Sequence, residues 1–278
     1  MALPVSARAQ AASAVPTQGS HATQASAYDR MVLTDHPVLF LTMGGASGQG
    51  GESDQSGFHH DGKYVPVSTA PPTVAMPNGD LARHFNGISQ YLEVPSAPAL
   101  SVSTTGILSI EAWISPDTLQ FDHQEGSGYV YWLGKGDRGQ YEYAMRMYSL
   151  GNAETPPRPN RISGYAFNPA GGLGSGSYFQ DPVVPGEWIH AVLVINSKAT
   201  SPQYPTGFVT IDKNGVARKT TGLDQFNVLP VAGRALFRVG TLDQRSFFAG
   251  SIGKVALYDY ELRGERILAH TRMMLGGK

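Results

Sequence analysis

The sequence has no cysteine, which excludes a disulfide framework, a thiolate metal site and a cysteine nucleophile. Charged residues make up only 15% of the chain, against about 25% in a typical soluble domain. The 21 basic and 22 acidic side chains nearly cancel, and no basic stripe marks a nucleic-acid interface. No apolar run approaches the ~18 residues of a membrane-spanning helix. We therefore expect neither a nucleic-acid partner nor a membrane span.

The sequence is instead rich in glycine, proline and tyrosine, with 33, 19 and 13 residues. Many turn residues and many aromatics favour a β-sandwich over a helical fold. Short β-like runs begin at residues 37–43 and are separated by turn signals. In the run at residues 107–116, apolar residues alternate with Glu111 and Trp113, which share the opposite face. No long helix separates these runs, so we predict an all-β antiparallel fold.

Residues 1–27 are rich in Ala, Ser and Gln, and we predict a flexible linker or the remnant of a trimmed secretory leader. Residues 28–278 show no internal repeat and are predicted to form a single domain. The dipeptide Asn86-Gly87 predicts a hairpin between its two flanking strands. Apolar periodicity predicts one helix, short and terminal, at residues 263–275.

Seven stretches in a fixed order carry a resemblance to a known family. They are "HPVLFLTMGG", "DQSGFHHDGKYV", "HFNGISQYLEVP", "LSIEAWISPDT", "PGEWIHAVLVIN", "IDKNG" and "FAGSIGKVALYDYEL". Together they resemble the laminin-G-like, concanavalin-A-like domains common in secreted bacterial proteins. The resemblance implies a two-sheet antiparallel jelly-roll β-sandwich with a short C-terminal helix. It implies no single function, because this fold carries lectins, carbohydrate-binding modules, glycosidases, lyases and spacer domains.

The stretch "DQSGFHHDGKYV" admits three interpretations. A zinc site is disfavoured, because adjacent histidines on extended chain point to opposite sides. Calcium takes hard oxygen ligands, which Asp54, Ser56 and Asp61 could supply. The resemblance implies a structural calcium near this loop, although Lys254 stands where the family has an acidic residue. The third interpretation is a turn in which Asp54 and Ser56 accept backbone hydrogen bonds.

Ten aromatic residues crowd the segment from residue 129 to residue 179. Sugar sites combine aromatic platforms with a few polar groups, and strand alternation places Glu142, Arg146 and Tyr148 on one face. Together with Tyr165 and Tyr178, which border loops, they form a candidate carbohydrate site. Arg146 has the chemistry to hold a carboxylate, such as that of a uronic acid. The alternative is that half of the aromatics fill the core and that Arg146 pairs with Glu142.

Catalysis has weaker support in the sequence. The resemblance implies that a glycosidase on this fold would carry an E-x-D-x-E strand, which places two carboxylates on one face about 5 Å apart, and the sequence has none. A polysaccharide lyase needs a base and a charge neutraliser, and Arg146, Tyr148, His190 and Glu111 supply these residue types. A structural role for His190 is the competing interpretation.

These observations favour a non-catalytic carbohydrate-binding or adhesive domain of a secreted or cell-surface bacterial protein. Its expected partner is a polysaccharide or glycan, and its one expected cofactor is a structural Ca²⁺. A glycine-rich loop at residues 168–181 and the connection at 151–160 are expected to line the binding groove. The first alternative is a polysaccharide-active enzyme, for which a lyase is favoured over a hydrolase. The second is a self-assembling protein in which residues 1–27 dock on a neighbouring copy.

Overall fold

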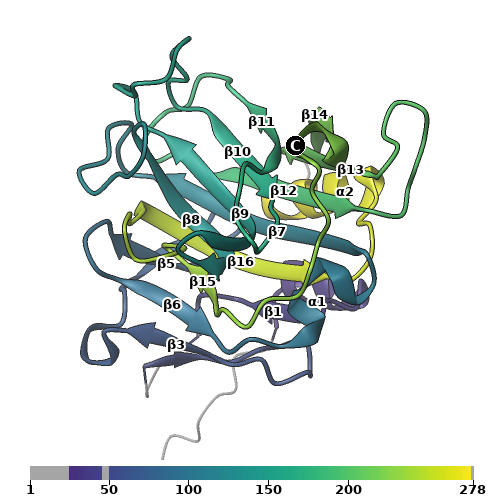
Figure 1. Ribbon diagram of the computed structural model, residues 1–278. Helices are drawn as coiled ribbons and strands as arrows, with labels where there is room; N and C mark the ends of the chain where they lie inside the picture. The colour runs from purple at the N-terminus through teal and green to yellow at the C-terminus, as the bar shows by residue number, and fades with distance from the viewer. Residues whose placement is uncertain (1–24, 46–49, 277–278) are drawn as a thin grey trace, which may run out of the picture.

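The computed structural model describes residues 25–45 and 50–276. Within these ranges, 16 strands form two antiparallel sheets that face each other. Figure 1 shows the sheets as the two layers of a sandwich. The predicted jelly-roll type of all-β fold is confirmed. Most of the N-terminal linker prediction falls on residues 1–24, outside the described residues.

The first sheet, called sheet A, contains the long strand at residues 107–116. Its order is β14-β13-β12-β7-β16-β5-β4, and β1 pairs with β16. The strands are β1 (Leu39–Leu41), β4 (Thr73–Ala75), β5 (Leu81–Asn86), β7 (Ile107–Pro116), β12 (Ile189–Asn196), β13 (Phe208–Lys213), β14 (Val216–Gly222) and β16 (Ala249–Tyr258).

The second sheet, called sheet B, contains the tyrosine-rich segment. Its order is β11-β10-β9-β8-β15-β6-β3-β2. The strands are β2 (Gly51–Glu52), β3 (Gly62–Val65), β6 (Tyr91–Val94), β8 (Tyr129–Asp137), β9 (Gln140–Tyr148), β10 (Ile162–Ala166), β11 (Ser175–Phe179) and β15 (Phe237–Val239).

The main core lies between the sheets, and the alternation of β7 shows how it forms. Leu108, Ile110 and Ile114 are fully buried in this core. Trp113 points the other way and is buried in a second cluster on the outer face of sheet A. Strand β7 therefore has two buried faces, one in the core between the sheets and one in the cluster on the outer face of sheet A.

Two helices cover that outer face. Helix α2 (Gly264–Met274) confirms the predicted terminal helix, and α1 (Ala27–Thr34) was not predicted. The Ser26 hydroxyl caps α1 by accepting from the backbone N–H of Asp29. Apolar residues from both helices pack on Trp113 and its neighbours, and Figure 1 shows α1 in purple and α2 in yellow. Four 3₁₀ turns complete the fold: η1 (Val67–Thr69), η2 (Pro98–Leu100), η3 (Val102–Thr104) and η4 (Leu223–Phe226).

Two local predictions are wrong. Strands β5 and β6 flank Asn86-Gly87 but belong to different sheets, so this turn is an arch between layers and not a hairpin. The Asn86 side chain shapes the arch by accepting backbone hydrogen bonds from Ile88, Ser89 and Gln90. The loop predicted at 168–181 is shorter than expected, because part of it forms the edge strand β11.

Candidate functional site

Two irregularities in the β8–β9 pairing determine which side chains reach the outer face of sheet B. In β8, Tyr131 pairs with Arg146 but Leu133 already pairs with the next residue of β9, so Trp132 is an extra residue. Trp132 and Leu133 therefore both enter the core, while Tyr131 stays on the outer face. In β9, the extra residue is Glu142. This second bulge brings Tyr141 to the outer face beside Tyr131.

The bulge also removes Glu142 from the face that carries Arg146, which corrects the sequence-based prediction. Glu142 is buried and contacts the ammonium group of Lys135. It also accepts a hydrogen bond from the backbone N–H of Gly233 at 2.8 Å. Glu142 is therefore the counter-ion of Lys135 and neither a surface sugar ligand nor the partner of Arg146.

Arg146 is held by three tyrosines. Its guanidinium carbon lies 4.2 Å from the ring centre of Tyr129, 4.3 Å from that of Tyr165 and 4.8 Å from that of Tyr148. Its Nη2 donates to the hydroxyls of Tyr148 and Tyr165 at 2.5 and 2.7 Å. Its buried Nε has no hydrogen-bond partner among the described residues. Ring faces and hydroxyls thus position this cation, and no carboxylate from the described part of the chain contacts it.

The carboxylate of the pocket lining, Glu154, is already engaged. It accepts from the Ser127 hydroxyl at 2.5 Å and lies 3.3 Å from the guanidinium of Arg158. The Ser127 hydrogen bond and the charge of Arg158 lower the pKa of Glu154, so it is ionised at neutral pH. Arg158 also donates to the Tyr148 hydroxyl at 2.9 Å. Glu154 and Arg158 therefore neutralise each other beside Arg146.

Burial and the charge of Arg146 affect the tyrosine pKa values in opposite directions. Desolvation raises the pKa of Tyr148 to about 12, although Arg146 partly opposes the rise. Desolvation would also raise the pKa of Tyr165, but Arg146 and hydrogen bonds to the hydroxyl outweigh it and lower that pKa. Tyr165 is thus the more acidic of the two hydroxyls that contact Arg146.

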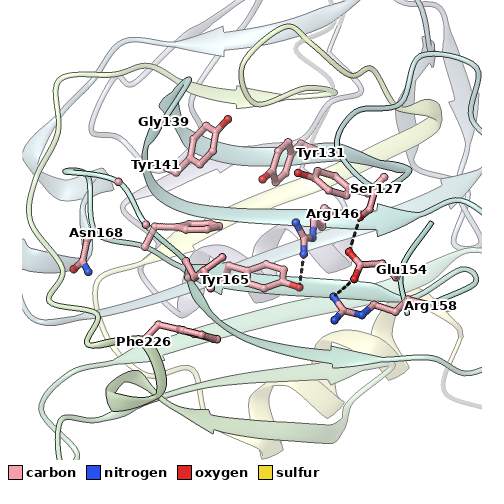
Figure 2. Close-up of a pocket in the computed structure, with 16 residues that line it drawn as sticks. Ser127, Tyr131, Gly139, Tyr141, Arg146, Glu154, Arg158, Tyr165, Asn168 and Phe226 are labelled. Atoms are coloured by element: carbon pink, nitrogen blue, oxygen red, sulfur yellow. Dashed lines mark hydrogen bonds and ion pairs between the residues drawn. The ribbon is translucent and has the colours of Figure 1, made fainter. Parts of the chain in front are cut away.

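These residues line a pocket of about 540 Å³ on the outer face of sheet B. Figure 2 shows Arg146 and Tyr165 facing the pocket, with Glu154 and Arg158 at one end. Phe226 and Leu173, which are 37% and 70% exposed, line it on an apolar side. The Asn168 side chain donates to the carbonyl of Asn227 and accepts from the N–H of Leu229. It therefore ties together the two loops of that side.

The other predicted sugar ligands have different positions. Tyr148 is fully buried and does not belong to the pocket lining, and its hydroxyl accepts hydrogen bonds from Arg146 and Arg158. Tyr178 lies on sheet B outside the pocket lining, where Arg161 and Lys219 stack on its ring at 3.8 and 4.1 Å. The lining includes residues that sequence reasoning did not single out, among them Ser127, Glu154, Arg158 and Phe226. The expectation that residues 151–160 flank the groove was a signal for Glu154 and Arg158, whereas Ser127 and Phe226 lie outside both predicted loops.

His190 and Glu111 lie in sheet A, so the proposed catalytic grouping with Arg146 and Tyr148 is wrong. Both side chains are fully buried under α1 and α2. Glu111 accepts from His190 and His270 at 2.9 Å each, and from the hydroxyls of Tyr28 and Tyr258 at 2.7 and 2.8 Å. The competing interpretation, a structural role for His190, matches this environment.

Histidine 270 links Glu111 to a second carboxylate. Its Nδ1 faces Glu111 and its Nε2 lies 2.7 Å from Asp35. Because ionised carboxylates only accept, both ring nitrogens carry hydrogens and the ring is charged. Burial opposes that charge, but the charge of Glu111 outweighs it and raises the pKa of His270. Burial opposes the Glu111 charge as well, yet the histidines hold the pKa of Glu111 well below its usual value.

The loop at Asp54 has the geometry of the turn interpretation. The Asp54 carboxylate accepts from the backbone of Phe40, Ser56 and His60, and from the Ser56 hydroxyl. Asp61 accepts from the backbone N–H of Asp54 at 2.8 Å. Within residues 25–45 and 50–276, no group of three or more His, Asp and Glu side chains is arranged to hold a metal ion. Calcium at Asp54, Ser56 and Asp61 stays a prediction.

The two facing antiparallel sheets define a β-sandwich of the jelly-roll type. The sequence profile of the concanavalin A-like lectin/glucanases superfamily matches residues 86–268, and the chain belongs to that superfamily. This confirms the resemblance seen in the sequence. No curated protein matches the chain at a significant level. None of the described helices is long and apolar enough to cross a membrane.

Solved structures share the fold at low identity. The receptor binding domain of the botulinum neurotoxin C/D mosaic serotype matches with a TM-score of 0.58 and 10% identity, over 86% of this chain and 51% of that chain. The serotype D ligand binding domain in complex with N-acetylneuraminic acid has a TM-score of 0.58, 11% identity and coverages of 86% and 51%. This chain thus spans about half the length of these neurotoxin chains. Domain 4 of AbnA, a GH43 extracellular arabinanase from Geobacillus stearothermophilus, in complex with arabinotriose, has a TM-score of 0.54 and 16% identity, over 84% and 98% of the two chains.

Proposed function

We propose that the Arg146 pocket binds a polysaccharide or glycan, and that the protein is a carbohydrate-binding or adhesive domain without catalysis. The observation that carries the proposal is the pocket itself: aromatic rings and a few charged groups meet on the outer face of sheet B, which neither of the two described α-helices covers. Sugar rings bind through stacking on aromatic faces and through hydrogen bonds from a small number of polar groups.

The aromatic surface has the right layout for a sugar ring. Tyr165 and Phe167 stack on each other, with ring centres 5.7 Å apart and an angle of 26° between the planes. Tyr141 lies beside Phe167, with ring centres 5.5 Å apart. The three rings give one end of the pocket a continuous apolar wall, and Arg146 supplies hydrogen-bond donors next to it.

Membership of a superfamily that contains lectins supports the proposal. So does the fact that domain 4 of the arabinanase, which shares the fold over 98% of its length, was solved with arabinotriose. Polysaccharides are mostly extracellular, so we further propose that the protein acts outside the cell or on the surface of a bacterium.

Binding to a panel of immobilised neutral and acidic polysaccharides tests the proposal. We expect the protein to bind at least one polymer, and Tyr165→Ala to lower that affinity by at least roughly tenfold, since Tyr165 lies at the centre of the pocket. Tyr178→Ala is the matched control, because Tyr178 is on the same sheet outside the pocket and should leave affinity unchanged. Absence of binding to every polymer would refute the proposal.

One observation favours a lyase as a second candidate. A tyrosine with a lowered pKa that contacts an arginine supplies a base next to a group that can neutralise a uronate carboxylate. The same panel tests this alternative. Release of unsaturated products, seen by their ultraviolet absorbance, and loss of that release in Tyr165→Phe would replace the binding proposal with the lyase.

A further inference from the structure

The charge environment of Arg146 differs from that of the buried cations. Within the described ranges, every buried lysine and arginine lies within 4 Å of a carboxylate. The pairs are Arg83–Glu52, Lys135–Glu142, Lys213–Asp181, Arg238–Asp137 and Lys254–Asp29. Arg146 is largely enclosed by tyrosine rings, yet no described carboxylate lies within that distance of its guanidinium nitrogens. In this respect it differs from the five buried cations of the described ranges, each of which has a carboxylate partner.

An enclosed and unpaired guanidinium is unfavourable unless an anion joins it. Removing a cation from water costs free energy, and stacking on tyrosine faces returns part of that cost. The Tyr148 and Tyr165 hydroxyls satisfy only Nη2. The charged residues of the pocket lining are Arg146, Arg158 and Glu154, so the lining has one excess positive charge. The site therefore lacks one negative charge.

The form of the pocket indicates how an anion would reach Arg146. Arg146 is on β9 and lines the pocket with Tyr165 and Phe167; its guanidinium lies over the Tyr165 ring, which in turn stacks on Phe167. Figure 2 shows the Tyr165 ring beside Arg146 and Glu154 beyond it. A ring with an apolar face and a planar anionic substituent fits this layout, with the ring on Tyr165 and the anion at Arg146.

We infer that the ligand is an acidic polysaccharide, and that the carboxylate of a uronic acid residue binds Arg146. This inference rests on the proposed function and specifies its ligand class. A carboxylate matches the planar donor geometry of guanidinium and carries the single charge that the lining lacks. Glu154 and Arg158 neutralise each other at the other end of the pocket, so that end offers no excess positive charge to a second acidic group.

The test compares each uronate polymer with its own carboxyl-reduced form. Polygalacturonate, alginate and hyaluronate are suitable, and dextran sulfate serves as a sulfated polymer. We expect at least one uronate polymer to bind roughly tenfold or more tightly than its reduced form, because charge-assisted hydrogen bonds are the strong ones. Moderate salt should weaken this preference only partly, since the cation is enclosed.

Variants assign the preference to Arg146. Arg146→Gln should bind the uronate polymer and its reduced form equally. Arg161→Gln is the matched control, because Arg161 also stacks on a tyrosine of sheet B but does not line the pocket; it should keep the full preference. Should Arg146→Gln fail to fold, Arg146→Lys keeps the charge without the planar donors and should lose most of the preference. The comparison of polymers on the unaltered protein needs no variant.

The outcomes separate this inference from the proposed function. Equal binding of every uronate polymer and its reduced form would overturn the inference and leave carbohydrate binding intact. Tighter binding of dextran sulfate than of any uronate would overturn the carboxylate assignment. Failure to bind any neutral or acidic polymer would overturn both proposals.

Discussion

The outer faces of the two sheets each carry a charged residue in the middle of a central strand, Glu111 in sheet A and Arg146 in sheet B. Glu111 lies under α1 and α2, is fully buried and accepts hydrogen bonds from four side chains. Arg146 lies at the floor of an open pocket and contacts tyrosine rings and hydroxyls instead of a carboxylate. The charged side chain on sheet A therefore has all its partners within the protein, whereas the one on sheet B has no counter-ion among the described residues.

The two α-helices determine which outer face is closed to ligands and which is open to them. Under α1 and α2, polar groups must find partners within the chain, because water and ligands are excluded. On sheet B, loops border the outer face without covering it. Arg146, which has no carboxylate partner among the described residues, therefore remains accessible to a ligand. A Glu–His–Asp cluster resembles catalytic machinery by composition, yet here it fastens the helices to the sheet.

The largest expected effect is the loss of stability on changing Glu111 to Gln. The new amide would place its own N–H donors among the four side chains that donate to Glu111. It would also leave the charged His270 without one of its two counter-ions. We expect these effects together to lower the unfolding free energy by about 3–5 kcal/mol. Urea denaturation measures it. Glu187→Gln is the control, since Glu187 is exposed and should change stability by less than about 0.5 kcal/mol. Equal stability of the two variants would contradict the comparison between the faces.

The pH dependence of stability follows from the same groups. Glu111 has a lowered pKa, so its contribution is present above its unfolded value of 4.5 and is lost as pH falls below it. His270 has a raised pKa, so its contribution is complete below its unfolded value of 6.5 and is lost at higher pH. Desolvation raises the pKa of Glu125 to about 7 and that of Asp212 to about 6, and their contributions also decrease as pH rises. We therefore expect the unfolding free energy to decrease from about pH 5 to about pH 8.

Urea denaturation across this range checks the sign, and one variant separates the two faces. Glu125 lies on the sheet B side of the molecule, where it accepts from the Ser246 hydroxyl at 3.0 Å. Glu125→Gln should flatten the decrease between its unfolded value of 4.5 and its folded value of about 7, while the His270 decrease above 6.5 persists. Stability that rises steadily toward alkaline pH would show that the sign is wrong.

The sandwich could be predicted from the sequence because each strand of a sandwich shows an alternation of residues that face the core and residues that face away from it. In β7, the apolar residues at 108, 110, 112 and 114 entered the core and Trp113 took the other face, as predicted. Helix α2 was visible through its apolar periodicity over 11 residues. Helix α1 has only eight residues, and its one local signal was the Ser26–Asp29 spacing of an N-cap.

The site was less predictable because bulges change the phase of alternation. Counting along β9 assigns Glu142 to the face of Arg146 and Tyr141 to the core, and the extra residue at Glu142 reverses both positions. No residue in "QYEYAMRMY" marks the bulge, since it depends on the pairing with β8. Ser127, Glu154 and Phe226 reach the pocket from loops whose paths depend on tertiary contacts.

A smaller effect is expected at the loops that border the open face in place of helices. Asn168→Ala removes both hydrogen bonds between the glycine-rich loop and residues 227–229. The freed loop must be ordered again on binding, so we expect a few-fold loss of polysaccharide affinity, about 1 kcal/mol, with little change in melting temperature. Titration calorimetry measures the affinity. Asn168→Asp keeps the acceptor for Leu229 and should lose less. Unchanged affinity in both variants would show that polysaccharide binding does not depend on these hydrogen bonds of the glycine-rich loop.

The smallest effect is expected at Asp54, a second carboxylate whose oxygens are fully occupied within the chain. Its four hydrogen bonds fix the turn to the backbone of β1 at Phe40, and a calcium ion would have to replace some of these donors. An ion stabilises only by mass action on the folded state, so we expect chelator to lower the melting temperature by at most about 2 °C. Scanning calorimetry with chelator and with added calcium measures this shift. A rise of several degrees in melting temperature with calcium would contradict this expectation. It would show that Asp54, like Arg146, interacts with a ligand from outside the chain.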